Sequence, residues 1–313
     1  MEKLGTRDFY GKTLLELGKE NPKIVALDAD LSVSTKTCLF AKEFPERFFD
    51  CGVAEADMIG VAAGLSLCGF IPFVSTFAVF GTGRCYDQIR QSVCISRTNV
   101  KIVVTHGGIT VGEDGATHQM LEDIALMTSL PNMRVIVPAD AHQTSAVIRF
   151  IAKEEGPFFV RLSRDKFPVI YDEKVEFKLP YADVLREGRD IVIFASGLMV
   201  HQSLACADIL LKSGIEVEVV NVASVKPLDR ETILKSAKKC KMAVSIEEHS
   251  VVNGVGSQIA SFLSEEFPIP LKILGIDDRF GVSGKPDDLI KYFELDPETI
   301  AEKIKLFLGR KKV

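Results

Sequence analysis

A single carboxylate, Glu55, stands in a segment whose other residues are mostly small or apolar. The segment covers residues 50–65 and reads DCGVAEADMIGVAAGL. Glycine inside a helix costs roughly 1 kcal/mol relative to alanine, so Gly60 and Gly64 suggest that another backbone comes close to this helix. A glutamate held against such an apolar wall is poorly hydrated and suited to sharing a proton with a ligand nitrogen. The alternative is an exposed glutamate in the first turn of a helix, which the helix dipole favours.

A second candidate is the polar loop at residues 106–119, HGGITVGEDGATHQ, which contains four glycines, two acidic residues and two histidines. Ligands of open parallel sheets bind beyond the carboxyl ends of the strands, and His106 directly follows a predicted strand. His118 is predicted in the first turn of the next helix, where the dipole opposes protonation and a neutral acid–base group could act. The alternative is a long surface loop with solvated histidines.

Three more polar residues are predicted at similar loop positions: Arg7, Ser34 and Arg164. If they converge with His106, they could hold an anionic group such as a sugar phosphate, because arginine offers paired donors. Separately, each of the three is typical of a protein surface. Phe77 and Phe80 could stack on a heteroaromatic ring, or they could belong to the core.

The elements that must position these residues alternate between short Val/Ile-rich strands and amphipathic helices. This alternation predicts parallel sheets covered on both faces. The fold class is therefore α/β, with two doubly wound domains at 1–166 and 190–313, separated by a Pro- and charge-containing linker at 167–189. The strands are predicted at 23–27, 70–77, 101–105, 134–138, 158–162, 191–196, 216–222, 242–246 and 271–276. The helices are predicted from residue 5 to before Asn21, at 79–96, 118–129, 141–153, 199–212, 230–239 and 254–266, and after the N-cap Asp296.

Composition excludes several classes of protein. The chain has 313 residues and a net charge of −5, without a long basic run, which argues against nucleic acid as a partner. It has no apolar run of about 18 residues and no signal-peptide pattern, so we expect no membrane contact. Seven cysteines without a CxxC pair indicate reduced thiols in the cytoplasm, and the five histidines form no zinc pattern with them. No GxGxxG or GxxxxGK[ST] motif provides a phosphate cradle.

Several segments together resemble the thiamine-diphosphate-dependent transketolases. They are CGVAEADMIGVAAGL, FVSTFAVF, VVTHGGITVGEDGATHQMLEDIALMTSLPNM and FVRLSR, in the family's order and spacing from residue 6 to residue 164. The family has pyrophosphate-binding, pyrimidine-binding and C-terminal domains, and this chain corresponds to the last two. The family's GDG signature for the diphosphate and metal is missing. The chain therefore resembles the C-terminal subunit of a split transketolase of the pentose phosphate pathway.

The resemblance implies a shared active site. A transketolase N-terminal subunit would hold Mg²⁺ and the diphosphate, in an α2β2 heterotetramer whose pyrimidine-binding and C-terminal domains also mediate self-association. In this chain Glu55 would bind the pyrimidine nitrogen of thiamine diphosphate, and Phe77 and Phe80 would hold the ring. The resemblance further implies that sugar hydroxyls and phosphate are bound by His106, Asp114, His118, Arg7, Ser34 and Arg164, with Glu55 and His118 in catalytic roles.

Some alternatives stay open. The β-subunit of a thiamine-dependent 2-oxo acid dehydrogenase has the same two domains, and a deoxyxylulose-phosphate synthase fragment and a non-catalytic scaffold are further possibilities. The run 80–86 is one residue longer than the family pattern, so Arg84 and Tyr86 receive no role. The helix that starts near 253–256 could bind an anion at its N-terminus, or could be a plain turn.

Overall fold

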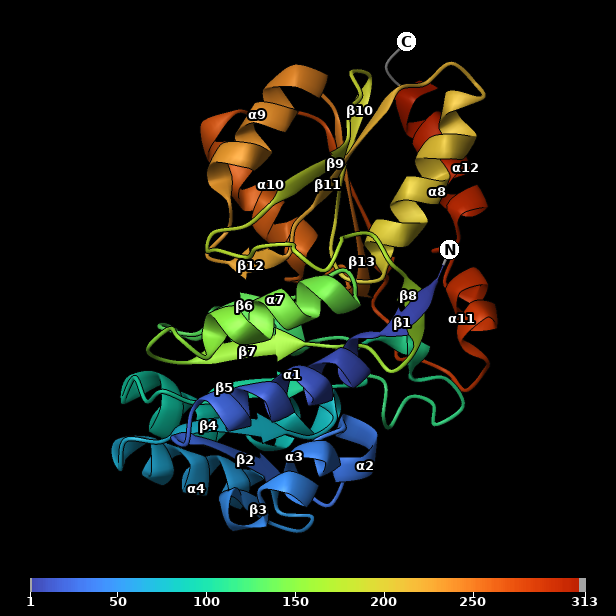
Figure 1. Cartoon of the computed structure of the whole chain (residues 1–313). Helices are drawn as coiled ribbons and strands as arrows, with labels where there is room; N and C mark the ends of the chain where they lie inside the picture. Colours follow the sequence, from blue (N-terminus) through green and yellow to red (C-terminus); the bar gives the residue numbers. More distant parts are fainter. Residues whose placement is uncertain (1, 310–313) are drawn as a thin grey trace.

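The computed structural model describes residues 2–309 and contains two α/β domains, one stacked on the other (Figure 1). Each domain has one large sheet with helices on both faces. Within these two sheets, every pair of neighbouring strands is parallel except for the pairs that include β9 or β12. The predicted fold class, two doubly wound α/β domains with mostly parallel sheets, is confirmed.

The N-terminal sheet has the strand order β12-β6-β7-β5-β4-β2-β3. Strand β2 (Ile24–Asp28) is buried at every position, and its side chains alternate between two cores. Ile24 belongs to the core on one face and Val25 to the core on the other. A strand buried on both faces is a continuous apolar run, which is why sequence alone reveals it. The other strands are β3 (Phe48–Asp50), β4 (Ile71–Ser75), β5 (Lys101–Val104), β6 (Arg134–Ile136), β7 (Phe158–Arg161) and β12 (Ser224–Lys226).

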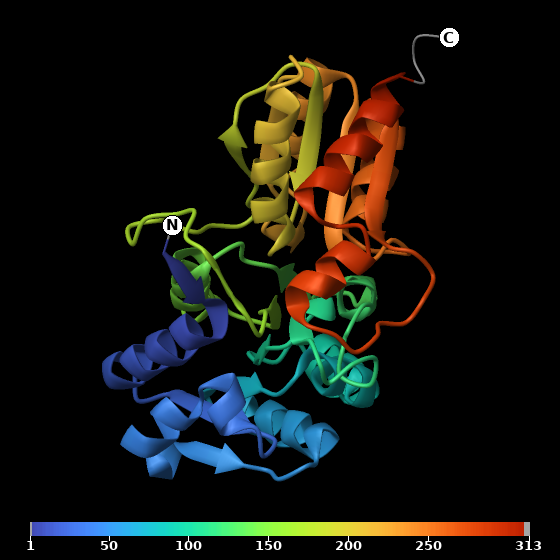
Figure 2. The ribbon, with the colours of Figure 1, turned by 90° about the vertical axis from the view of Figure 1, so that its right-hand side faces the viewer.

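Helices cover both faces of this sheet (Figures 1 and 2). Helices α1 (Thr6–Glu20) and α7 (Ala141–Ile151) pack side by side on one face. Helices α4 (Glu55–Leu67) and α6 (Asp123–Ser129) contribute to the core on the other face. Shorter helical elements complete the domain: α2 (Ser32–Thr35), α3 (Cys38–Glu43), α5 (Tyr86–Gln88), and the 3-10 turns η1 (Pro45–Arg47) and η4 (Ile109–Val111).

The segment 79–96 is helical, as predicted, but it is not a regular α-helix. Two π-helical segments, η2 (Phe80–Arg84) and η3 (Ile89–Ile95), flank the short helix α5. A π-turn accommodates an additional residue without ending the helix, and such turns are frequent at functional sites. The wide turn at η2 lies within the run 80–86, the segment that the sequence shows to be one residue longer than the pattern of the resembled family.

Helix α6 starts later than the sequence predicts. It begins at Asp123, so His118 lies in the preceding loop and not in a first helical turn. The carbonyl of Met120 accepts a hydrogen bond from Gly108 N (2.9 Å), a donor far away in the loop. A helix extended back to 118 would need that carbonyl for its own ladder. The predicted influence of a helix dipole on His118 is therefore wrong.

The C-terminal sheet has the strand order β14-β13-β10-β11-β9. Helices α8 (Met199–Leu211) and α12 (Pro297–Gly309) pack on one face, and α9 (Arg230–Cys240) and α10 (Val255–Glu266) on the other (Figure 1). The Asp296 carboxylate accepts a hydrogen bond from Thr299 N at 3.0 Å, which confirms the predicted N-cap of α12. The remaining elements are β9 (Asp183–Arg186), β10 (Ile191–Ala195), β11 (Val217–Asn221), β13 (Ala243–Ser250), β14 (Leu271–Ile276) and α11 (Pro286–Tyr292).

Residues 167–189, which we predict as a linker, are held at both ends. Strand β8 (Lys166–Pro168) pairs antiparallel with β1 (Lys3–Gly5), and β9 forms an edge of the C-terminal sheet. A strand from the C-terminal half of the chain also joins the N-terminal sheet: β12 pairs with β6 at its edge. Strand pairing therefore connects the two domains in addition to the covalent link.

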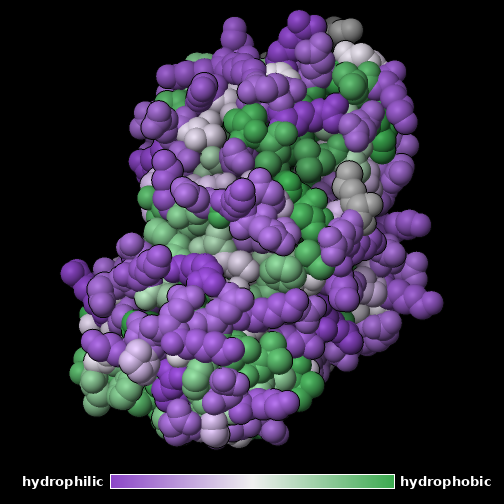
Figure 3. Space-filling view, in the orientation of Figure 1, coloured by the Kyte–Doolittle hydropathy of each residue, from purple (hydrophilic) through white to green (hydrophobic). Residues whose placement is uncertain are grey.

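Figure 3 shows hydrophilic side chains over most of the visible face, with smaller hydrophobic patches on both domains. Among residues 2–309, no helix combines the length and the apolar character that crossing a bilayer requires. Within the same residues, no group of three or more His, Cys, Asp or Glu side chains is arranged to hold a metal ion.

Candidate active site

Glu55 is buried at the N-terminal end of α4, with only 3% of its side chain exposed. The alternative of an exposed glutamate is therefore wrong. Its carboxylate pairs with Arg84, whose Nη1 lies 3.0 Å from Oε1 and 3.2 Å from Oε2. Arg84 comes from the π-turn η2, and 52% of its side chain is exposed. The acid is thus enclosed by protein, while its cationic partner lies at the edge of the solvent.

Four aromatic side chains gather beside this ion pair. Phe77 and Phe80 stack with their ring centroids 6.0 Å apart, and the imidazole of His106 stacks on Phe77 at 3.7 Å. The ring of His118 meets Phe80 edge-on at 5.4 Å. The Arg84 guanidinium lies over the Phe80 ring, 4.4 Å from its centroid. The structure therefore brings the acid and the aromatic candidates into one group.

His106 is held in an unusual conformation. It has a φ of +63°, only 3% of it is exposed, and its Nδ1 lies 2.7 Å from Thr105 Oγ1. Burial, together with the nearby charges of Arg7 and Arg164, lowers the pKa of His106 to about 3. The imidazole is therefore neutral near pH 7 and can take part in hydrogen bonds without carrying charge.

The basic candidates also converge. Nη1 of Arg7 donates to the carbonyl of Ser34 at 3.0 Å, whereas the buried Nε of Arg7 has no hydrogen-bond partner in the described chain. Arg164 donates to the carbonyl of Val111, and its Nη1 lies 3.5 Å from Oδ2 of Asp114. The two arginines are close enough for Arg164 to help lower the pKa of Arg7, after the larger effect of burial. This pairing of Arg164 with Asp114 is a contact that the sequence did not predict.

A cavity of about 990 Å³ lies next to the two arginines, between the domains. It is lined by residues of both domains, which include Arg7, Thr110, Arg164, His201 and Lys285. Glu55, Phe77, Phe80, His106 and His118 are not part of its lining. The acid and the aromatic group therefore lie outside this cavity, and among them Phe80 and His118 are partly exposed.

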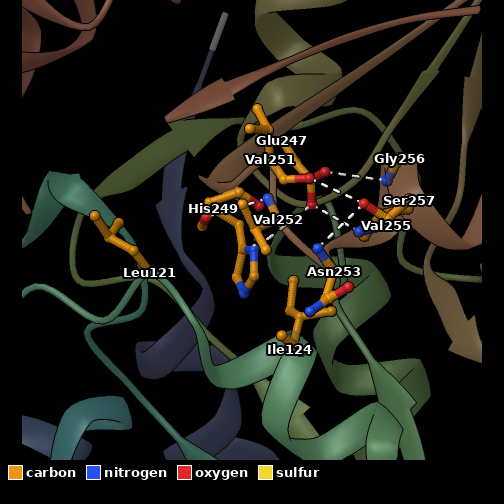
Figure 4. Close-up of polar contacts among 12 residues, drawn as sticks. Leu121, Ile124, Glu247, His249, Val251, Val252, Asn253, Val255, Gly256 and Ser257 are labelled. Atoms are coloured by element: carbon orange, nitrogen blue, oxygen red, sulfur yellow. Dashed lines mark hydrogen bonds and ion pairs between the residues drawn. The ribbon is translucent and has the colours of Figure 1, made fainter. Parts of the chain in front are cut away.

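The helix start at 253–256 already binds a carboxyl group of the chain itself. The carboxylate of Glu247 accepts hydrogen bonds from Val255 N (2.7 Å) and Gly256 N (3.0 Å), as Figure 4 shows. A Cβ at position 254 would lie 2.1 Å from this carboxylate, which explains the glycine there. Burial raises the pKa of Glu247 to about 7. This N-terminus anchors α10 to β13, so the alternative of a free anion site is not supported.

Arg84 is the site residue to which sequence reasoning assigned no role. The one available indication was the additional residue in the run 80–86, which the structure shows as a π-turn. Nothing in the local sequence indicates that this turn aims a guanidinium at Glu55, because the contact joins two different elements 29 residues apart.

The fold and the grouped residues define a two-domain α/β protein with a buried acid next to a cluster of aromatic side chains, and comparison with known proteins identifies the family. Residues 2–169 match the transketolase pyrimidine binding domain, and residues 180–300 match the transketolase C-terminal domain. The chain belongs to the transketolase family.

Individual relatives agree with this assignment. The chain is 48% identical over 303 residues to a protein of Methanocaldococcus jannaschii named as a transketolase C-terminal section, covering 96% of this chain and 95% of that protein. It is 42% identical to a 6-deoxy-6-sulfo-D-fructose transketolase subunit of Clostridium sp., covering 96% and 93%. A solved split gene transketolase, described as an inactive beta4 tetramer, superposes with a TM-score of 0.90 at 47% identity over 98% and 99% of the two chains. The resemblance to the C-terminal subunit of a split transketolase is confirmed.

Proposed function

We propose that this chain is the C-terminal subunit of a transketolase that moves a two-carbon ketol unit from a ketose phosphate to an aldose phosphate, with thiamine diphosphate as cofactor. The observation that carries the proposal is the buried Glu55 carboxylate, which Arg84 links to the ring of Phe80. The guanidinium of Arg84, which is flat and carries N–H donors, stacks on the ring of Phe80 and donates a hydrogen bond to Glu55. An aminopyrimidine ring is also flat and carries nitrogen, so the same residues fit it.

Glu55 and the two phenylalanines act on the cofactor in this proposal. Thiamine diphosphate supplies, when bound, the carbon nucleophile that attacks the ketose. Glu55 holds a proton at the pyrimidine ring nitrogen, and its burial keeps water from competing for that hydrogen bond. Phe77 and Phe80 fix the plane of the ring between the acid and the histidines.

The remaining polar residues serve the sugar. His106, Asp114 and His118 bind hydroxyl groups, and His118 also moves protons, while a neutral His106 can donate or accept a hydrogen bond. Arg7 and Arg164, with Ser34, bind the phosphate. The buried Nε of Arg7 finds no acceptor among residues 2–309, and this supports the role because an anion would supply one.

A partner subunit completes the site. The sequence lacks the family's GDG signature, so we assign the diphosphate and Mg²⁺ mainly to a transketolase N-terminal subunit. The complex is then an α2β2 heterotetramer, with two copies of this chain in contact. The free thiols of all seven cysteines support a reducing compartment, the cytoplasm, in which the pentose phosphate pathway would use the enzyme.

The face of α4 that carries Gly60 and Gly64 is a candidate surface for self-association. Both glycines are exposed, and a Cβ at either position would meet no atom of the described chain within 4 Å. The glycines imply that another backbone comes close to α4, and within residues 2–309 no such backbone does. Large apolar side chains nearby in the sequence are also exposed, among them Val53 (72%) and Leu67 (77%). Such exposed apolar groups are typical of subunit interfaces.

Gly64→Leu is expected to weaken self-association while the chain stays folded. The leucine points away from its own protein, where nothing lies within 4 Å, but it would clash with a second backbone packed on this face. Analytical ultracentrifugation should give a dissociation constant for self-association at least about tenfold higher than that of the wild type, a loss of about 1.4 kcal/mol in association free energy. The control is Ser264→Leu, on the exposed side of α10. Equal oligomerisation of both variants and the wild type would exclude this surface.

Arg84→Met is expected to tighten cofactor binding by the assembled enzyme by up to about fivefold, because a half-exposed ion pair contributes about 0–1 kcal/mol and this one competes with the ligand. Arg84 occupies the space over Phe80 and must leave before a ring can stack there. Isothermal titration of thiamine diphosphate in the presence of Mg²⁺ measures the change. Arg90→Met, at an exposed position of the same helical segment, is the control. Weaker binding by Arg84→Met would contradict this account.

The experiment that tests the function mixes the chain with a transketolase N-terminal subunit, thiamine diphosphate and Mg²⁺. We expect conversion of xylulose 5-phosphate and ribose 5-phosphate. A sulfonated ketose is a second candidate donor, because one relative is named for 6-deoxy-6-sulfo-D-fructose and arginine binds sulfonate much as it binds phosphate. Pyruvate decarboxylation without ketol transfer would instead support the 2-oxo acid dehydrogenase alternative.

A further inference from the structure

The loop that carries the sugar-binding candidates rests directly on the C-terminal domain. Gly108, at its start, has a φ of +86°, and a Cβ there would lie 2.3–2.7 Å from the Glu248 carboxyl group of strand β13. A Cβ at Gly107 would lie 2.6–3.0 Å from the side chain of Arg161. The two glycines therefore allow the backbone of the loop to lie against these side chains.

Glu248 holds the loop by a hydrogen bond across the domain boundary. Its Oε1 accepts from Thr110 N at 2.7 Å, and the residue is only 3% exposed. Thr110 lies in the turn η4, whose last carbonyl, that of Val111, accepts a hydrogen bond from Arg164. The carboxylate of Glu248 therefore fixes the turn η4. Arg164, a predicted phosphate-binding residue, is hydrogen-bonded to that same turn.

Arg161 ties the backbone of Glu248 to the C-terminal end of the loop. Its Nη2 donates to the carbonyl of Glu248 at 2.9 Å and lies 3.3 Å from the carbonyl of Met120, while its Nε donates to Asp123 at 2.8 Å. From the C-terminal domain, Ser250 N donates to the carbonyl of Leu121 at 2.8 Å. The loop is thus anchored near residue 110 and again at 120–123.

Glu247, the neighbour of Glu248, has a different role. Consecutive residues of a strand point to opposite faces, and Glu247 reaches the N-terminus of α10 instead of the loop (Figure 4). The two glutamates are equally buried, at 1% and 3% exposure, and each accepts backbone hydrogen bonds. They therefore form a matched pair, of which only one touches the site loop.

We propose that Glu248 is a positioning residue of the active site, and that the C-terminal domain thereby sets the geometry of the loop that bears His106, Asp114 and His118. This rests on the proposed function for the roles of these three residues, but the anchoring of the loop can be tested without any turnover. The C-terminal domain contributes none of the predicted site residues. Through Glu248 it would nevertheless take part in the reaction.

The test compares Glu248→Asp with Glu247→Asp, which shorten adjacent side chains by the same methylene group. Hydrogen–deuterium exchange of the isolated chain should show about tenfold or more faster exchange at 107–119 for Glu248→Asp, the effect of losing a charge-assisted hydrogen bond. Glu247→Asp should leave that loop unchanged and accelerate exchange at the start of α10. Glu248→Gln keeps the length and one acceptor oxygen, and should exchange more slowly in the loop than Glu248→Asp.

The assembled enzyme supplies a second readout. Glu248→Asp should lower kcat/KM for the ketose donor about tenfold with unchanged affinity for thiamine diphosphate, and Glu247→Asp should change neither. Faster loop exchange with wild-type kinetics would overturn the positioning role and leave the proposed function intact. Wild-type exchange in Glu248→Asp, or equal loop exchange in both Asp variants, would overturn the anchoring itself. Absence of ketol transfer by the wild type would count against the proposed function alone.

Discussion

Replacement of Glu55 by glutamine is expected to lower the turnover of the assembled enzyme by at least about 100-fold, the usual contribution of a positioned acid–base group. Glutamine keeps the size of the side chain but cannot hold an acidic proton at the pyrimidine nitrogen. The fold should survive, because the partner left behind, Arg84, is half exposed and can be hydrated. Steady-state kinetics at saturating cofactor measure the loss, and circular dichroism checks the fold.

The control for this substitution is Asp57→Asn, two residues further along the same helix. Asp57 also lies in the first turn of α4, but its side chain is exposed. Removing its charge should therefore alter turnover less than about twofold, since surface substitutions rarely have larger effects. Activity of Glu55→Gln within a few-fold of the wild type would remove the central residue from the proposed mechanism.

The second large effect is expected on stability. Asp123 and Arg161 form an ion pair that is 0% and 6% exposed, with a distance of 2.8 Å from Arg161 Nε to Asp123 Oδ2. Asp123→Ala leaves the guanidinium buried without its carboxylate, which typically costs about 3–5 kcal/mol. His249 lies nearby, but burial lowers its pKa to about 4, so it adds no positive charge near pH 7. Urea unfolding at pH 7 measures the loss as a lower midpoint.

Glu20→Ala is the control for this second prediction. Glu20 pairs with Arg149 at 3.0 Å on the surface, where the two side chains are 56% and 40% exposed. Exposed pairs contribute about 0–1 kcal/mol, because water and salt screen them. The two substitutions should therefore differ clearly in their unfolding midpoints. Similar shifts for both would show that burial of the Asp123–Arg161 pair does not govern its contribution.

Much of the fold could be predicted because it is encoded locally. The parallel strands of both domains are short apolar runs, and the cap at Asp296 is a sequence pattern that the structure confirms. Strands without such a pattern could not be predicted. One example is β12, which is three residues long and lies in the C-terminal half of the chain, yet pairs with the N-terminal sheet. Its place depends on the partner strand and not on its own composition.

The candidate site likewise contains residues that the sequence predicts and one residue that it does not. Residue type and position beyond the strand ends were enough to select Phe77, Phe80, His106 and His118, which the structure places in one group. They were not enough to find Arg84, because a π-turn directs that side chain toward Glu55. The roles of these residues in binding and catalysis stay predictions.

Local pattern was therefore sufficient for the class of fold, the polar loop and the acid at the head of α4. Residue identity and spacing along the chain carry that information, through strand alternation, capping and glycine content. The three-dimensional structure alone decided which charges meet: Arg84 with Glu55, and Glu248 with Thr110, 138 residues away. Such contacts depend on how separate elements pack, and a side chain gains a buried partner only once that packing brings the two together.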